Sequence, residues 1–255
     1  MFSGVVPTMT LDFFAKTSGT WINVLAVALG TSLGLLLKHR LPVRMQRIIT
    51  QGVALITLFI GFSMAGSLTQ VKAGRVDGVV LGLLTMVLGG LLGEWLQIEA
   101  KLESLGDWLK ARFKGSGSFT QGFVVASLLF CVGPMAVLGS LSNGLTGDDT
   151  LLTLKSVMDG ISSVALSSSF GAGVGFSVVV ILLYQGGISL VAGVLAQALP
   201  DPATDPQILL ITGVGGLMIL GTGINLLELT QVRVASFLPA LGLAPLLYQI
   251  AKFIG

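Results

Sequence analysis

The sequence predicts an all-α polytopic membrane protein with about eight transmembrane segments and one amphipathic surface helix. Its mean hydropathy is +0.93. Only 10% of the 255 residues are charged, whereas soluble domains carry about 25%. Apolar runs close to the roughly 20 residues that span a bilayer recur along the chain. The 35 glycines are spread through these runs, as close helix packing in lipid favours.

Charge, cysteine and histidine content exclude several function classes. A net charge of +2 is too small to indicate a nucleic-acid partner. One cysteine, Cys131, and one histidine, His39, provide neither an internal disulfide nor a zinc, copper or iron site, and no cofactor is expected. Residues 1–18 are expected to be an N-terminal extension rather than a cleaved signal peptide, because the apolar run after them recurs later in the chain.

Eight apolar segments follow one another along the chain. They cover residues 19–37, 48–68, 78–96, 122–141, 160–183, 186–199, 208–229 and 234–254. With the loop after the first segment in the cytoplasm, nine lysines and arginines lie inside and five outside, and Lys155 is counted among the outer five. This bias predicts a multi-pass membrane protein with both termini outside the cytoplasm.

Residues 99–114 are different in kind, because apolar side chains share one helical face and charges lie opposite. The apolar positions are Leu102, Leu105, Trp108, Leu109 and Phe113. Such a helix is expected to lie on the cytoplasmic membrane surface. It is either a connector that anchors the bundle or an element that regulates the protein or binds a partner.

The two halves of the chain align as an internal repeat. The matched positions are Gly19, Gly30 and Gly34 with Gly160, Gly171 and Gly175 at a shift of 141; Gln51, Gly82, Gly89 and Glu94 with Gln185, Gly216, Gly223 and Glu228 at 134; and Val125 to Ser127 with Val234 to Ser236 at 109. We therefore expect two four-helix repeats, 19–141 and 160–255, joined by a polar connector at 142–159. Parallel copies are favoured, whereas a re-entrant segment would make the copies inverted.

Several stretches of the chain resemble one bacterial membrane family. They are GTWIN at 19–23, GEWLQIE at 93–99, GFVVASLLFCVGPMAVLGS at 122–140, GLTGDDTLLTLKSVMDGISS at 144–163, LLYQGGISL at 182–190 and GTGINLLEL at 221–229. The chain is similar in these stretches to the DUF554 family. The resemblance implies a multi-pass inner-membrane protein regarded as a candidate transporter, and it implies no substrate and no functional residues.

Polar residues in or beside the apolar segments are the candidates for a substrate or ion pathway, because hydrocarbon offers them no hydrogen-bond partner. They are Asn23, Glu94, Ser127, Asp159, Ser163, Ser167, Gln185, Asn225 and Glu228. Most have a structural alternative. The asparagines could tie helices together, the glutamates could cap the membrane boundary, Asp159 could favour a helix start, and the serines could form a tight helix contact.

Proline and glycine mark expected helix breaks. Gly133 and Pro134 interrupt the fourth segment, and Pro239 lies at the matching place in the eighth. Broken helices expose backbone carbonyls and helix ends at the substrate sites of transporters, although simple kinks are also common in membrane helices.

Together these patterns predict a secondary transporter or channel-like carrier of a small solute or ion, without catalytic activity, in the form of a homodimer in the lipid bilayer. The acidic groups and the lack of a buried basic residue favour a cation or a neutral solute. A scaffold or sensor that transports nothing is the alternative. A Ser/Lys hydrolase built on Lys155 is a third interpretation.

Overall fold

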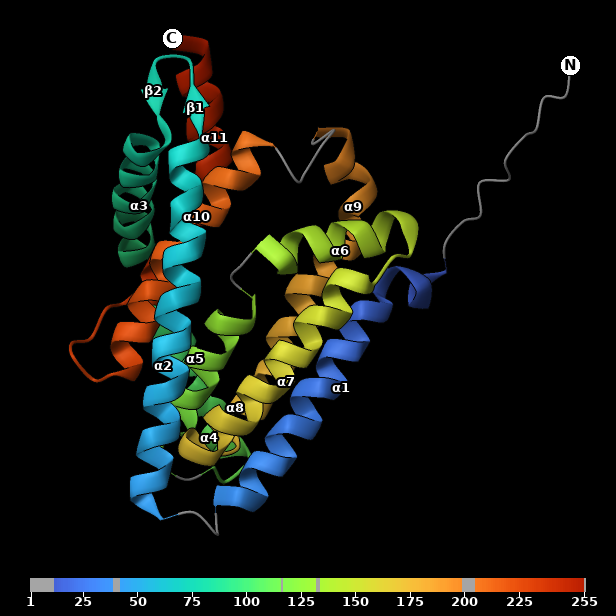
Figure 1. Ribbon diagram of the computed structural model, residues 1–255, viewed down its shortest axis with the longest axis vertical. Coiled ribbons are helices and arrows are strands. Elements are labelled where there is room, and N and C mark those ends of the chain that lie inside the picture. Colours follow the sequence, from blue (N-terminus) through green and yellow to red (C-terminus); the bar gives the residue numbers. More distant parts are fainter. Residues whose placement is uncertain (1–11, 39–41, 116, 132–133, 199–204, 255) are drawn as a thin grey trace, which may run out of the picture.

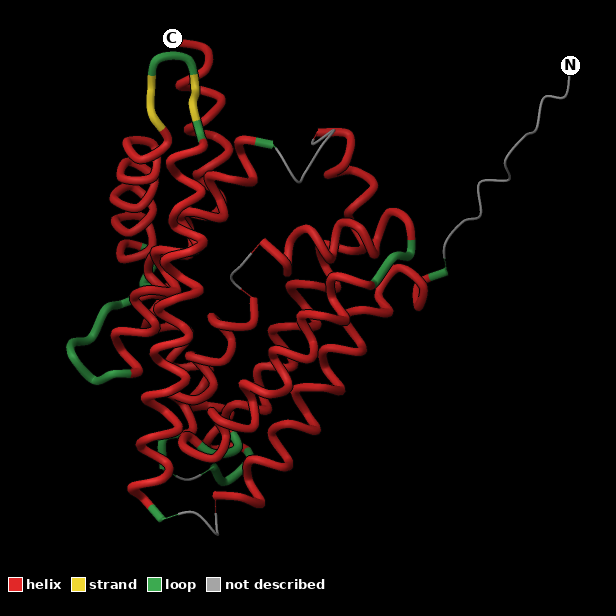
Figure 2. Tube along the Cα trace, in the orientation of Figure 1, coloured by secondary structure: helices red, strands yellow, loops and turns green. Residues whose placement is uncertain are grey.

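The computed structural model describes residues 12–38, 42–115, 117–131, 134–198 and 205–254. Almost all of the described chain is helical, which confirms the predicted class (Figures 1 and 2). The long helices are α1 (Phe13–Lys38), α2 (Val43–Ala65), α3 (Gly78–Trp95), α7 (Thr150–Phe170), α10 (Pro206–Leu226) and α11 (Leu238–Ile254). The shorter ones are α4 (Ile98–Arg112), α5 (Phe119–Cys131), α6 (Pro134–Thr146), α8 (Gly173–Ile181) and α9 (Gly187–Ala198).

Short irregular elements join these helices. A π-helical turn, η2 (Leu182–Gly186), makes α8 and α9 one continuous rod. The 3-10 turn η1 (Gly66–Gln70) and a two-stranded hairpin, β1 (Lys72–Ala73) and β2 (Val76–Asp77), connect α2 to α3. A second 3-10 turn, η3 (Val234–Phe237), precedes α11.

The helices pack in pairs. Helix α1 lies along α7, α2 along α10, α3 against α11, α5 against α8, and α6 against α9. In Figure 1 the group α2, α3, α10 and α11 stands on one side and the α1–α7 pair on the other. Contacts between α2 and α7 join the two groups.

Six of the described helical stretches are long and apolar enough to cross a membrane, and the pair α5–α6, bent by 60°, would make a seventh. The predicted number of eight and the two-repeat origin stay predictions. Helix α7 is not among the six. It carries a lysine, an aspartate and several serines, and it packs against α1 and α2.

Two observed helix boundaries differ from the predicted segment boundaries. The segment expected at 160–183 is interrupted because α7 ends at Phe170 and Gly171 adopts φ 89° and ψ −155°, a conformation open essentially only to glycine. The connector expected at 142–159 is mostly helix, since α6 continues to Thr146 and α7 begins at Thr150. Asp148 forms an Asx turn just before α7, because its Oδ1 accepts bonds from the Thr150 amide at 3.0 Å and the Thr150 hydroxyl at 2.6 Å.

The predicted amphipathic helix is α4, and the structure anchors it to the bundle. Leu109 packs with Phe119 and Phe123 of α5, whereas Leu105 and Trp108 are exposed. The Glu99 carboxylate accepts bonds from the backbone amides of Ala235 at 2.7 Å and Ser236 at 3.2 Å. Figure 1 shows α4 at the end of the molecule where α1 passes into α2.

Candidate transport site

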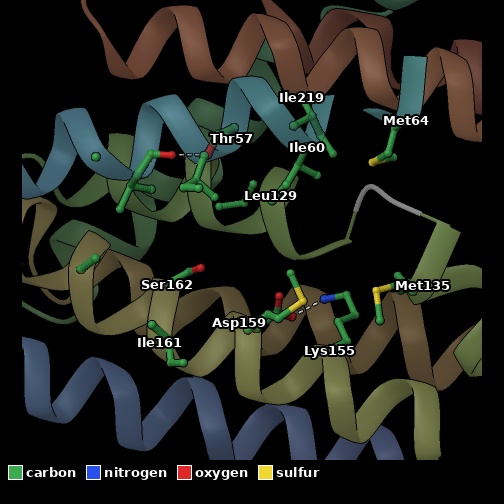
Figure 3. Close-up of a pocket in the computed structure, with 16 residues that line it drawn as sticks. Thr57, Ile60, Met64, Leu129, Met135, Lys155, Asp159, Ile161, Ser162 and Ile219 are labelled. Carbon is green, nitrogen blue, oxygen red and sulfur yellow. Dashed lines mark hydrogen bonds and ion pairs between the residues drawn. The ribbon is translucent and has the colours of Figure 1, made fainter. Parts of the chain in front are cut away.

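A cavity of about 370 Å³ lies between α2, α7, α10 and the α5–α6 break (Figure 3). Its wall is predominantly apolar. The apolar lining residues are Gly52, Val53, Ile56, Ile60, Met64, Leu129, Met135, Ala136, Met158, Ile161, Ala165 and Ile219. The polar lining residues are Thr57, Lys155, Asp159 and Ser162. The cavity is therefore mostly apolar, and its one charged wall is formed by α7.

The charged wall is an ion pair between Lys155 and Asp159, one helical turn apart on α7. Both residues are buried, with exposed fractions of 6% and 7%. Figure 3 shows both side chains in the space between α7 and the α2 side of the cavity. An isolated charge in such a place is strongly disfavoured, so each side chain depends on the other.

Two amides extend this pair away from the cavity into the α1–α7–η2 contact. Asn23 Nδ2 of α1 donates to Asp159 Oδ2 at 2.9 Å and to Gln185 Oε1 of η2 at 3.2 Å. Asn23 and Gln185 have no exposed surface. The structure thus brings together three residues that the sequence suggested separately, Asn23, Asp159 and Gln185.

The cluster is incompletely satisfied within the described part of the chain. Asn23 Oδ1 and Gln185 Nε2 are buried and have no hydrogen-bond partner there. Asp159 Oδ2 receives both bonds to the carboxylate, from Lys155 and Asn23. Buried polar groups without partners are uncommon in structural cores and are a frequent feature of functional sites.

The helix break on the other side of the cavity matches the expected one. Helix α5 ends at Cys131 and α6 begins at Pro134, so the break separates Leu129 from Met135, both of which line the cavity. Gly133 lies outside the described residues. Pro239 does not break a helix, because it is in the first turn of α11, where its missing N–H costs no helical hydrogen bond.

The serine stripe fits its structural alternative. Ser163 donates to Gly160 O at 2.8 Å and approaches Val27 O of α1 at 3.3 Å. Ser167 donates to Ser163 O at 2.5 Å and lies 3.3 Å from Thr31 O. Both serines face α1 rather than the cavity, and Ser162, on the other side of α7, lines it instead.

Small residues permit this tight α1–α7 contact. A Cβ at Gly30 would lie 2.2 Å from the Gly160 carbonyl oxygen, and one at Gly34 would lie 2.0 Å from Ser167 Oγ. Both distances are far below van der Waals contact. Glycine at these positions lets the two backbones approach, as expected for helices packed in lipid.

The remaining predicted residues lie away from the cavity. Glu94 pairs with Arg233 at 2.5 Å, and both side chains are about half exposed. Asn225 stabilises the loop after α10. Its Nδ2 donates to Val232 O and its Oδ1 accepts from Val232 N, both at 2.7 Å. Glu228 is exposed.

Ser127 is a special case. It is buried in α5 and its hydroxyl has no partner among the described residues, but it does not line the cavity. The four residues Glu94, Ser127, Asn225 and Glu228 are therefore not brought together with the Asn23 cluster.

Comparison with known sequences places these features in a family. The model of the family described as "Protein of unknown function (DUF554)" matches residues 18–249. The chain belongs to the DUF554 family. It is 28% identical to the "Uncharacterized membrane protein YdfK" of Bacillus subtilis (strain 168) over 93% of this chain and 98% of the relative.

A second relative is more similar residue by residue. The "Uncharacterized protein YqgA" of Escherichia coli (strain K12) is 32% identical over 89% of this chain and 94% of its own length. No solved structure matches the chain. The family match and the apolar helices together show a multi-pass membrane protein.

Sequence reasoning misplaced Lys155 and missed the methionines that line the cavity. Lys155 was assigned to an outer loop, and the structure buries it in α7. The expectation that buried basic residues are lacking is therefore wrong. The signal was present, since Lys155 and Asp159 are four residues apart, which is the spacing of an intrahelical ion pair.

Proposed function

We propose that this protein is a secondary transporter that carries a small solute across the membrane through the cavity beside α7. The observation that supports transport most strongly is the Lys155–Asp159 pair on the wall of an otherwise apolar cavity. Charged residues within membrane helices are costly and mark substrate or ion pathways in many transporters. A cavity of about 370 Å³ is within the range of small-molecule sites.

Broken and irregular helices around the cavity support the same proposal. The α5–α6 break lies at the cavity, which Leu129 and Met135 line, and the π-turn η2 contributes Gln185 to the cluster beside Asp159. π-Turns occur frequently at functional sites, and discontinuous helices form the substrate sites of many carriers. An alternating-access motion would use such joints as hinges.

A catalytic role has less support. The Lys155 ammonium pairs with Asp159, and the hydroxyls of Ser163 and Ser167 donate to backbone carbonyls. A Ser/Lys hydrolase requires the lysine within hydrogen-bond reach of the nucleophilic serine. We therefore propose that the protein has no enzymatic activity.

We also propose that the protein is a homodimer of the bacterial inner membrane. Apolar side chains such as Leu25, Leu29, Phe59, Phe62 and Leu91 are exposed on α1, α2 and α3. These faces must meet lipid or a second copy of the chain. The mass of the detergent-solubilised protein, measured by light scattering, tests the dimer.

Flux into proteoliposomes tests the transport proposal. Purified protein is reconstituted and assayed with a panel of cations, amino acids, amines and organic acids under an imposed ion gradient. The expected result is saturable uptake of at least one solute. The double variant K155M/D159L, which removes both charges without leaving one unpaired, is expected to abolish that uptake.

The exposed substitution E228Q is the matched control and should transport like the unmodified protein. Absence of uptake for the whole panel by folded protein would contradict the transport proposal. It would favour a scaffold or sensor instead.

A further inference from the structure

The polar cluster leaves one oxygen on each of two facing side chains without a partner. Asn23 donates through Nδ2 to Asp159 Oδ2 at 2.9 Å. Asn23 Oδ1 is buried without a donor. Among the described residues, no donor reaches Asp159 Oδ1 either. Neither oxygen carries a hydrogen, so a hydrogen bond between them requires a proton on one of them.

A proton on Asp159 supplies that hydrogen. A carboxylic acid and a primary amide form a ring of two hydrogen bonds, with the amide N–H donating to one carboxyl oxygen and the acid O–H donating to the amide oxygen. The first bond already exists between Asn23 and Asp159. The second requires only a turn about the terminal torsions of the two side chains, which are broad. Asn23 can therefore bond Asp159 in both protonation states, through its N–H to the carboxylate, as observed, and through its amide oxygen to the protonated acid.

Protonation of Asp159 would leave Lys155 as a buried charge without a counterion, so the cavity would have to provide one. An ammonium has three N–H donors, and among the described residues Lys155 bonds only to Asp159. Lys155 also lines the cavity. An anionic group in the cavity could take the place of the Asp159 carboxylate at Lys155. Apart from Thr57 and Ser162, the rest of the wall is apolar, which suits a ligand with a hydrocarbon body.

We propose that the cavity binds a small carboxylate with an apolar body, and that Asp159 takes up one proton when the carboxylate pairs with Lys155. Charges balance in this exchange. The Lys155–Asp159 pair is neutral before binding, and afterwards the ligand carboxylate neutralises Lys155 while protonated Asp159 bonds Asn23. The cargo is one carboxylate plus one proton, which carries no net charge. This inference rests on the transport proposal and specifies its substrate class.

Few other titratable groups face Asp159. Cys131 of α5 lies within electrostatic range of both Lys155 and Asp159, and Tyr184 of η2 lies within range of Cys131. Among the described residues that line the cavity, α2, α5, α6 and α10 provide no charged side chain. From α1, the group in contact with Asp159 is the uncharged amide of Asn23. Proton uptake in this region is therefore assigned to Asp159.

Calorimetry on the purified protein in detergent tests the proposal. The probes are straight-chain monocarboxylates of increasing length, the alkylamines of the same lengths, and the corresponding primary amides. Titration in buffers of different ionisation enthalpy counts the protons exchanged. We expect carboxylates to bind with uptake of close to one proton, and amines and amides to bind at least tenfold more weakly. Above the pKa of the Asp159 carboxyl in the ligand-free protein, the affinity for carboxylates should fall about tenfold per pH unit.

Three variants separate the roles within the cluster. K155M is expected to lose carboxylate binding. D159N keeps an amide partner for Asn23 but has no proton to take up, so it should bind carboxylate with no proton uptake and no such pH dependence. Asn23→Leu should bind about tenfold more weakly, because the neutral acid loses one hydrogen bond. E228Q is the exposed control and should behave like the unmodified protein.

Infrared difference spectra provide a readout that does not depend on variant folding. Addition of carboxylate to the unmodified protein should produce a C=O band of a protonated carboxylic acid. Binding of carboxylates without proton uptake, or preferential binding of amines, would overturn the inference. Loss of carboxylate binding alone, while other solutes are still transported into liposomes, would overturn it and leave the transport proposal standing. Carboxylate binding with proton uptake but no flux of any solute would overturn the transport proposal and leave the binding inference standing.

Discussion

At the scale of single residues, the centre of the molecule is Asp159. Its Oδ2 bonds both Lys155 of its own helix and Asn23 of α1. A buried ion pair contributes little net stability, because desolvation offsets most of the attraction. Its presence in an apolar wall therefore indicates a role other than holding the fold. Removal of one partner and removal of both should have different consequences.

Single and double removal of the pair provide the first prediction. D159L leaves Lys155 buried without a counterion and should destabilise the protein by about 3–5 kcal/mol. K155M/D159L removes both charges and should cost much less. Thermal unfolding in detergent checks both variants alongside K155M. A double variant as unstable as the worse single variant would show that the pair is chiefly structural.

The second residue-scale prediction concerns Gly171. Its φ of 89° with ψ −155° is strained for any residue with a Cβ, so Gly171→Ala should destabilise the protein by about 1–3 kcal/mol. Gly242→Ala is the control, since that glycine is in α11 and a Cβ there meets nothing within 4 Å. The control should be neutral or slightly stabilising. Equal unfolding midpoints for the two variants would contradict this reading of the helix break.

At the scale of elements, the surface helix α4 is held through its own Glu99 carboxylate, which binds backbone amides of η3. Desolvation raises the pKa of Glu99 above its ordinary value, and the amide bonds from Ala235 and Ser236 oppose that shift only in part. A raised pKa in the folded state means that folding favours the protonated form. The stabilisation is present below the unfolded pKa of 4.5 and is lost as pH rises through the folded pKa.

The prediction at this scale is a pH-dependent difference between the unmodified protein and E99Q. The stability of the unmodified protein relative to E99Q should fall as pH rises from below 4.5 towards neutrality. Unfolding midpoints at a series of pH values measure that difference. E228Q should show no comparable trend, and a difference that grows with pH would reverse the assigned sign.

The elements also show where sequence reasoning succeeded and where it failed. The amphipathic pattern at 99–114 predicted α4 because a charged face opposite an apolar face is a local property. The boundary at Gly171 was missed because the residues on both sides are compatible with a helix, and only the backbone conformation at this glycine ends it. The start of α7 at Thr150 was missed because the polar residues Asp148, Asp149 and Thr150 suggested a loop, and they precede or begin the helix while largely exposed.

At the scale of the whole molecule, hydropathy predicted the class, but pairing between distant helices decided the site. Asn23, Asp159 and Gln185 are on three different elements, and their contact depends on how α1, α7 and η2 pack. The sequence shows each as a polar residue in an apolar run. It does not show that Ser163 faces α1 while Ser162 faces the cavity, because that depends on the rotation of α7 against its neighbours.

The different positions of Ser162 and Ser163 test the central claim, which is that water reaches the cavity beside α7 within the membrane. Cys131 is the only cysteine, so a Cys131→Ala background is free of thiols. In that background, Ser162→Cys and Ser163→Cys place one thiol on the cavity wall or in the α1–α7 contact. Reaction with a small charged thiol reagent is followed in proteoliposomes. The account predicts labelling of Ser162→Cys and little labelling of Ser163→Cys, whereas two unreactive thiols in folded protein would mean a dry, sealed centre and contradict it.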